Sequence, residues 1–169
     1  LAILRGEAVD TVLIGSLRAG EANVRKAAMD ALGRRRSAQP VPELLKAASD
    51  SDPDIREAAF KALGETARLA DLSALVGLMA KDGSSSAAAE AAVERTCARL
   101  ADKEACAAPV LAALPPAGPA AKASLVRLLG QLGGNRSLAA VRSALEDADS
   151  GVRKAAVQAL ADWPDAGAS

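Results

Sequence analysis

The sequence contains no histidine and no tyrosine, and its aromatic residues are one phenylalanine, Phe60, and one tryptophan, Trp163. Without histidine, the chain cannot build a Ser-His-Asp or Cys-His catalytic arrangement or a histidine metal site. Two aromatic rings also cannot form a stacking platform for bases or for a flat cofactor. We therefore expect no enzyme activity, no metal and no cofactor.

An excess of charge of either sign is also absent, because 21 basic side chains balance 21 acidic ones. Domains that bind nucleic acid through phosphate contacts usually carry a clear basic excess. No uninterrupted apolar run approaches the roughly 20 residues that a membrane helix needs. Half of the 169 residues are apolar, which is too many for a disordered chain. We therefore expect one domain over residues 1–169 that binds no nucleic acid and does not insert into a membrane.

One ten-residue pattern recurs along the chain. It reads apolar, Arg, charged, Ala, Ala, apolar, polar, Ala, Leu, small over residues 24–33, 55–64 and 152–161. Two weaker copies cover 88–97 and 121–130. The leucine position of the pattern steps by 31, 33, 33 and 31 residues through Leu32, Leu63, Thr96, Leu129 and Leu160. A nearly constant period of this length is the signature of a stacked repeat array.

Each copy predicts a helix, and a second helix follows it. Apolar residues of the first helix fall at helical spacing, as at Ile55, Ala59 and Leu63. The position three residues before each copy suits a helix N-terminus in four of five cases; it is occupied by Glu21, Asp52, Ser85, Gly118 and Asp149. The second apolar stretches cover 41–48, 72–79, 110–114 and 138–145. We expect an all-α protein of about five helix hairpins in series.

The run from Asp52 to Ala59, together with Leu63 and Gly64, resembles a HEAT repeat of the short type named after phycobilisome lyases. The resemblance extends over nearly the whole chain. It implies a right-handed α-solenoid with the first helices on the convex side and the second helices on the concave side. It also implies a ladder of acidic and basic side chains along the stack, here Arg25, Arg56, Lys122 and Arg153 next to Glu21, Asp52 and Asp149.

The third copy departs from the pattern. Ala89 replaces the basic residue, Ser84-Ser85-Ser86 replaces the acidic loop, and extra residues enter on both sides of this helix. We expect a local change of curvature there. The two cysteines of the chain, Cys97 and Cys106, would face each other across this hairpin. Two interpretations stay open: a disulfide that staples the repeat, or a pair of small buried residues.

The ends of the array raise a separate question. One period before Leu32 lies Leu1, so the chain begins inside a hairpin. We expect its first residues to be the tail of an incomplete helix, which leaves the second helix over 9–17 without its partner. An uncovered repeat face needs a cap, so we expect further repeats upstream in a longer chain, or self-association through this end. Trp163 is expected to cover the last hairpin.

The outward positions of the second helices carry mostly small residues, and one copy supplies all their charges. They include Glu43, Lys46, Ala74, Gly77, Leu78, Ala112, Ala113 and Ser143. Small side chains let a partner's backbone approach closely, and apolar surface of this kind marks interfaces. The alternative is that these positions have no binding role, because an alanine-rich chain tolerates alanine at exposed positions. We predict a non-enzymatic scaffold that binds a partner protein along the concave face through these residues.

An alternative function follows from the resemblance alone: an accessory subunit of an enzyme such as a bilin lyase-like protein. The compartment is equally open from the sequence. A cytoplasmic location is the default, and a bridge between Cys97 and Cys106 would favour an extracytoplasmic one.

Overall fold

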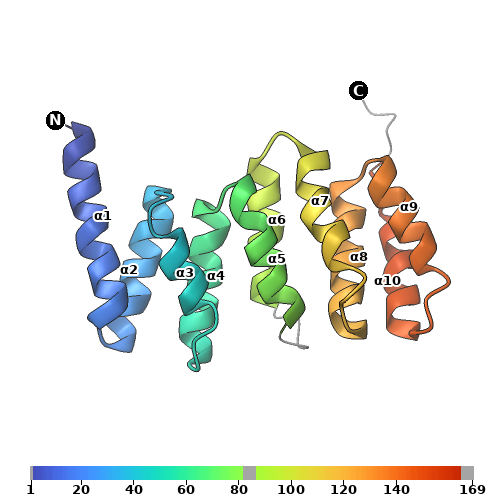
Figure 1. Ribbon diagram of the computed structural model, residues 1–169, viewed down its shortest axis with the longest axis horizontal. Helices are drawn as coiled ribbons and strands as arrows, with labels where there is room; N and C mark the ends of the chain where they lie inside the picture. Colours follow the sequence, from blue (N-terminus) through green and yellow to red (C-terminus); the bar gives the residue numbers. More distant parts are fainter. Residues whose placement is uncertain (1, 82–86, 165–169) are drawn as a thin grey trace.

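A computed structural model describes residues 2–81 and 87–164, and this part of the chain is helical throughout, without a strand. The helices lie side by side in two layers, with the first and the last helix at opposite ends of the array (Figure 1). The first helices of the repeats form one layer and the second helices the other. The first helices are α2 (Ala22–Arg35), α4 (Pro53–Thr66), α6 (Ala87–Arg99), α8 (Pro119–Leu132) and α10 (Ser150–Ala161). The second helices are α1 (Ala2–Ala19), α3 (Val41–Ala47), α5 (Leu72–Lys81), α7 (Lys103–Ala113) and α9 (Asn135–Ala144), with a 3₁₀ turn, η1 (Leu69–Asp71), before α5.

The repeated leucine position lies in the core, as the period predicts. The side chains of Leu32, Leu63 and Leu129 are fully buried, and Leu160 in the last helix is partly buried. Thr96 occupies the same position in α6 and is also fully buried. Its hydroxyl donates to the backbone carbonyl of Ala92 at 2.8 Å, which satisfies the only polar atom that replaces the leucine side chain. The predicted register of the repeats is therefore confirmed.

Two of the predicted helix caps form with the expected geometry. The Asp52 carboxylate accepts from the backbone N–H of Asp54 at 2.9 Å, and Pro53 takes the first helical position. The Asp149 carboxylate accepts from the N–H groups of Gly151 and Val152. Glu21 precedes α2 without a side-chain cap bond. The expected cap at Ser85 lies outside the described residues.

The pairing at the start of the chain differs from the prediction. Helix α1 runs without a break from Ala2 to Ala19, so its first residues are not the tail of a separate helix. It packs extensively on α2, and Arg35 of α2 reaches back to the buried carboxylate of Asp10 in α1. Throughout the array each second helix packs against the first helix that follows it. The helix over 9–17 therefore has a partner, which the expectation of an unpaired helix missed.

The first helices approach one another closely through small residues. A Cβ placed on Gly33 would lie 3.4 Å from the Cα of Ala62 in the next first helix. At Gly130 the added atom would lie 2.6 Å from the Cβ of Ala159 and 3.0 Å from its Cα, closer than real Cβ contacts come. The small residue after each leucine of the repeat therefore has a physical reason. It lets α2, α4 and α6, and again α8 and α10, pack nearly backbone to backbone.

This close packing of the first helices is interrupted between α6 and α8. These two helices meet far less extensively than α4 and α6 or α8 and α10. At the same junction the second helices α5 and α7 make their most extensive contact with each other. We call this junction the α6–α8 seam. The irregularity expected at the third copy lies here. On either side of the seam the first helices pack closely on one another, whereas at the seam the second helices make the closer contact.

No helix in the described ranges combines the length and apolar character needed to cross a bilayer. Buried apolar side chains from α1 to α10 instead join into one continuous core between the two layers.

Candidate protein-binding surface

The sequence-predicted contact residues lie on one layer of the array. We call this surface the second-helix face and define it by Glu43 and Lys46 on α3, Ala74, Gly77 and Leu78 on α5, Ala112 and Ala113 on α7, and Ser143 on α9. All eight are at least partly accessible, and Lys46, Ala74, Ala112 and Ser143 are exposed. The neighbouring Ala47 and Ala144, which the same register placed outward, are buried in the core. The second-helix face is therefore narrower than the repeat pattern indicated.

The curvature around this face also differs from the expectation. A concave second-helix layer would require the second helices to lie closer together than the first helices. Instead, α2, α4 and α6 pack closely, whereas α1, α3 and α5 make little contact with one another. Second helices come together mainly at α5 and α7. The face is therefore splayed over its first half.

The splayed packing opens a hollow between α3 and α5. It has a volume of about 400 Å³ and is lined by Leu45, Lys46, Ala74, Gly77 and Leu78. Gly77 contributes to the opening, since a Cβ added there would meet no other atom within 4 Å. Leu45 belongs to the apolar stretch over 41–48 and is not one of the predicted contact residues. It is only partly buried and forms one wall of the hollow.

The charges on this face are concentrated near α1 and α3. Arg18 in the last turn of α1 donates to the Glu43 carboxylate at 2.7 Å, and Lys46 approaches the same carboxylate at 3.4 Å. The hydrogen bond from Arg18 lowers the pKa of Glu43 most strongly; burial opposes it, and the hydrogen bond from Lys46 lowers the pKa further. The sequence analysis missed Arg18. Its spacing of 25 residues from Glu43 equals that of three other ion pairs, Asp10–Arg35, Arg25–Asp50 and Lys122–Asp147.

The first-helix layer has a different character. A hollow of about 460 Å³ lies between α2 and α4, with small residues at its floor and charged side chains on both walls. The cations on these walls are all paired: Lys61 with Asp30 at 3.5 Å, Arg34 with Asp30, and Lys26 with Asp54 at 3.2 Å. Because each of these cations already has an anion, the hollow presents few unpaired charges to a partner, although many charged residues line it.

The predicted ladder forms with different acids. Arg25 pairs with Asp50 at 2.6 Å, and the next basic residue, Arg56, donates to the backbone carbonyls of Asp50 and Ser51. The Asp50 carboxylate also accepts from the backbone N–H of Asp52 at 3.0 Å. That backbone bond and Arg25 together lower the pKa of Asp50. Asp52, the acid predicted for the ladder, instead caps α4.

The same arrangement recurs in the last two repeats. Lys122 pairs with Asp147 at 3.0 Å, and Arg153 donates to the backbone carbonyls of Asp147 and Ala148, both at 2.8 Å. The backbone N–H of Asp149, followed by Lys122, lowers the pKa of Asp147. In both places one aspartate joins two consecutive first helices. A second aspartate, two residues later, caps the next helix.

The two cysteines are free thiols in this structure, and both are buried. Burial, followed by the neighbouring Cys106 thiol, raises the pKa of Cys97 to about 12. This places the two thiols against each other at the α6–α7 connection.

At the C-terminal end of the array, Trp163 is partly buried against the core.

Together these features define a class of protein: an α-solenoid in which pairs of helices repeat along one axis. The family model for HEAT repeats matches residues 9–94, and the chain belongs to the HEAT-repeat family. Among 24 matching solved chains is the crystal structure of an engineered protein, a target of the Northeast Structural Genomics Consortium. It is similar over 95% of this chain and 81% of that chain, with a TM-score of 0.53 and 20% identity, a likeness that shows the fold alone. No curated protein matches the chain significantly.

Proposed function

We propose that the chain is a non-enzymatic scaffold that binds a partner protein along the second-helix face. The observation that supports this most directly is the hollow between α3 and α5, which is lined by four of the eight predicted contact residues. Of the remaining contact residues, Glu43 lies on α3, and the others continue onto α7 and α9. A partner helix or strand laid across these helices would meet small side chains on α5, α7 and α9 and the paired charges of Glu43 and Lys46 on α3.

The binding energy would come mainly from apolar burial. Removing apolar surface from water contributes about 25 cal/mol per Å², against which the cost of association must be set. Leu45 and Leu78 are the large apolar side chains at the hollow, and Ala74 and Gly77 leave room beside them. The charges of Arg18, Glu43 and Lys46 already neutralise one another in part. We therefore expect affinity for the partner to depend weakly on salt concentration.

Site-specific photocrosslinking identifies the face that touches a partner. A photoreactive amino acid at position 74 or 112 should crosslink to the partner, whereas the same amino acid at position 91, exposed on α6, should not. Once the partner is identified, its affinity can be measured for Ala74→Glu and for the matched control Ala91→Glu. We expect Ala74→Glu to weaken binding by about tenfold or more, because it places a charge against an apolar contact.

Two results would contradict the proposal. One is crosslinking from position 91 in preference to positions 74 and 112. The other is a steep fall in affinity with added salt, which would indicate a charged interface instead of a small-residue one.

The accessory-subunit alternative predicts a different activity. The purified protein would be incubated with a bilin and an apo-phycobiliprotein, and covalent transfer would be followed by absorbance. Transfer that depends on this chain would favour the alternative over the scaffold.

A further inference from the structure

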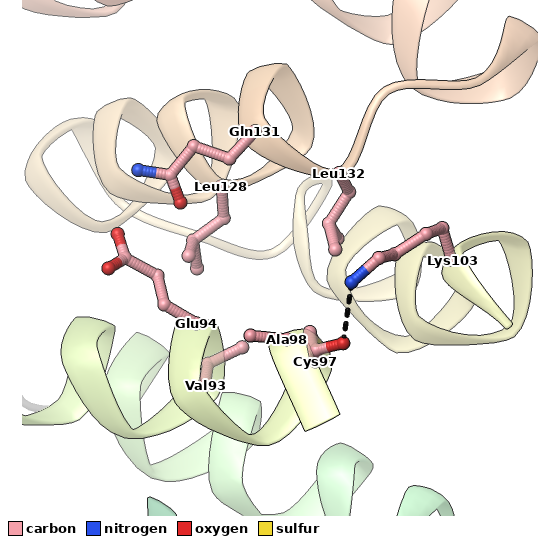
Figure 2. A pocket seen from close by; sticks show the side chains of 8 residues that line it. All are labelled: Val93, Glu94, Cys97, Ala98, Lys103, Leu128, Gln131 and Leu132. Atoms are coloured by element: carbon pink, nitrogen blue, oxygen red, sulfur yellow. Dashed lines mark hydrogen bonds between the residues drawn. The ribbon is translucent and has the colours of Figure 1, made fainter. Parts of the chain in front are cut away.

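The α6–α8 seam leaves a cleft in the first-helix layer. The cleft has a volume of about 230 Å³ and is lined by side chains of α6, α8 and the start of α7 (Figure 2). Its apolar walls include Val93 and Leu128, both buried, and the partly buried Leu132. This volume is below the range of about 300–1,000 Å³ that is typical of sites for drug-sized ligands and cofactors. The cleft is of a size to receive one side chain.

One end of the cleft carries a carboxylate without a partner in the described part of the chain. Glu94 on α6 and Gln131 on α8 lie at this end in Figure 2, and neither side chain makes a hydrogen bond or ion pair with any described residue. One helical turn earlier on both helices, Glu90 and Arg127 form an ion pair of 2.7 Å across the seam. The amide of Gln131 therefore stands where a second cation would complete the same arrangement.

The opposite end of the cleft carries a positive charge that is already bound. The ammonium group of Lys103 donates to the backbone carbonyl of Cys97 at 2.8 Å, as the dashed line in Figure 2 marks. A cation entering the cleft is therefore repelled at this end and attracted at the Glu94 end. The apolar walls between the two ends suit an aliphatic stem.

We propose that the cleft between α6 and α8 binds the side chain of a lysine or arginine from a partner protein. The aliphatic stem packs against Val93, Leu128 and Leu132, and the cationic head binds the Glu94 carboxylate and the amide oxygen of Gln131. The cleft belongs to the first-helix layer. Its failure would leave the proposal for the second-helix face untouched, and the reverse holds as well.

Nuclear magnetic resonance titration of the ¹⁵N-labelled chain tests this site. The probes are the N-acetyl, N-methylamide derivatives of lysine, arginine, norleucine and glutamate. Lysine or arginine should cause saturable shifts of backbone amides in residues 94–98 and 128–132, and the difference between these two probes identifies the preferred head group. Norleucine has the stem without the charge and should bind about tenfold more weakly, since a charge-assisted hydrogen bond is lost.

Variants separate binding from folding. Glu94→Gln keeps the shape and removes the charge, and it should weaken lysine binding by about tenfold. Glu146→Gln, in the exposed loop before α10, removes the same charge elsewhere and should leave binding unchanged. Ala98→Leu fills the cleft from an exposed helical position and should abolish binding while the circular dichroism spectrum stays helical.

Several outcomes would overturn the proposal. Equal affinity for norleucine and lysine would show that the cation is not recognised. Preferential binding of the glutamate probe would assign the cleft to an anion at Lys103. Unchanged lysine binding in both Glu94→Gln and Ala98→Leu would place the probe elsewhere on the surface, and the absence of saturable shifts with any probe would show that the cleft is not a side-chain site.

Discussion

Replacing Gly130 with alanine tests the close packing of the first helices. Gly130 lies inside α8, where alanine is the better helix former by about 1 kcal/mol. Helix propensity alone therefore predicts that Gly130→Ala stabilises the protein. The packing against α10 predicts the opposite sign, so the substitution separates the two effects.

The geometry sets the size of the packing effect. Carbon atoms in good contact lie about 3.5–4.0 Å apart, whereas the new Cβ would lie 2.6 Å from the Cβ of Ala159 and 3.0 Å from its Cα. A rotamer change cannot relieve this overlap, since Ala159 has none, so α10 must move away. Overpacking of this kind costs about 1–3 kcal/mol, and movement of a backbone favours the upper value. After the gain in helix propensity, we expect Gly130→Ala to lower the free energy of unfolding by about 2 kcal/mol.

Urea denaturation followed by far-ultraviolet circular dichroism measures this change. The matched control is Gly77→Ala in α5, where no atom lies within 4 Å of the new Cβ. It should raise the free energy of unfolding by about 0.5–1 kcal/mol. Adding Ala159→Gly to Gly130→Ala removes the atom that is overlapped, so the double variant should lose less than the sum of the two single variants. A Gly130→Ala protein as stable as the Gly77→Ala control would refute the reasoning.

Three further predictions concern the core, the ladder and the thiols. Leu63→Ala, at a fully buried position, should cost about 2–5 kcal/mol of unfolding free energy in urea, whereas the exposed Val157→Ala should change it by less than about 0.5 kcal/mol. The lowered pKa values of Asp50 and Asp147 mean that their contribution to stability is present above their ordinary pKa of 3.8 and is lost as pH falls through the lowered values. The urea midpoint of Asp50→Asn should therefore fall less steeply with acid than that of the natural sequence, and an identical acid profile would count against the ladder. A pKa of about 12 keeps Cys97 protonated at pH 8, so a thiol reagent should label it in urea but not in the native protein. Labelling of neither cysteine in urea without reductant would show that Cys97 and Cys106 are bridged.

The features that follow from local periodicity could be predicted from the sequence. The leucine column and the caps at Asp52 and Asp149 each depend on residues within one helix and its preceding loop. Because the pattern repeats, a core leucine or a cap recognised in one copy predicts the equivalent residue in the others. The location of the irregularity was also readable, because the third copy lacks the basic residue and gains residues at both sides.

Features that depend on contacts between repeats could not be predicted in the same way. Asp50 and Asp52 are both acids in one loop. Only their distances to Arg25 and to the next backbone N–H groups decide which of the two pairs with Arg25 and which caps α4. The partner of α1 was missed because the pattern fixes the period but not which of two neighbouring helices packs more closely. The cleft at the seam was missed for a related reason: Glu94 and Gln131 lie 37 residues apart and belong to different copies.

The α6–α8 seam also has a consequence for how force and fluctuations travel along the molecule. In a linear array, each unit is coupled only to its neighbours, and cooperativity passes through the interfaces one after another. The helices up to α6 form one block and those from α7 onward form another, joined by the least extensive first-helix contact in the described part of the array. Coupling between the two blocks therefore passes mainly through the contact of α5 with α7, in the layer of second helices.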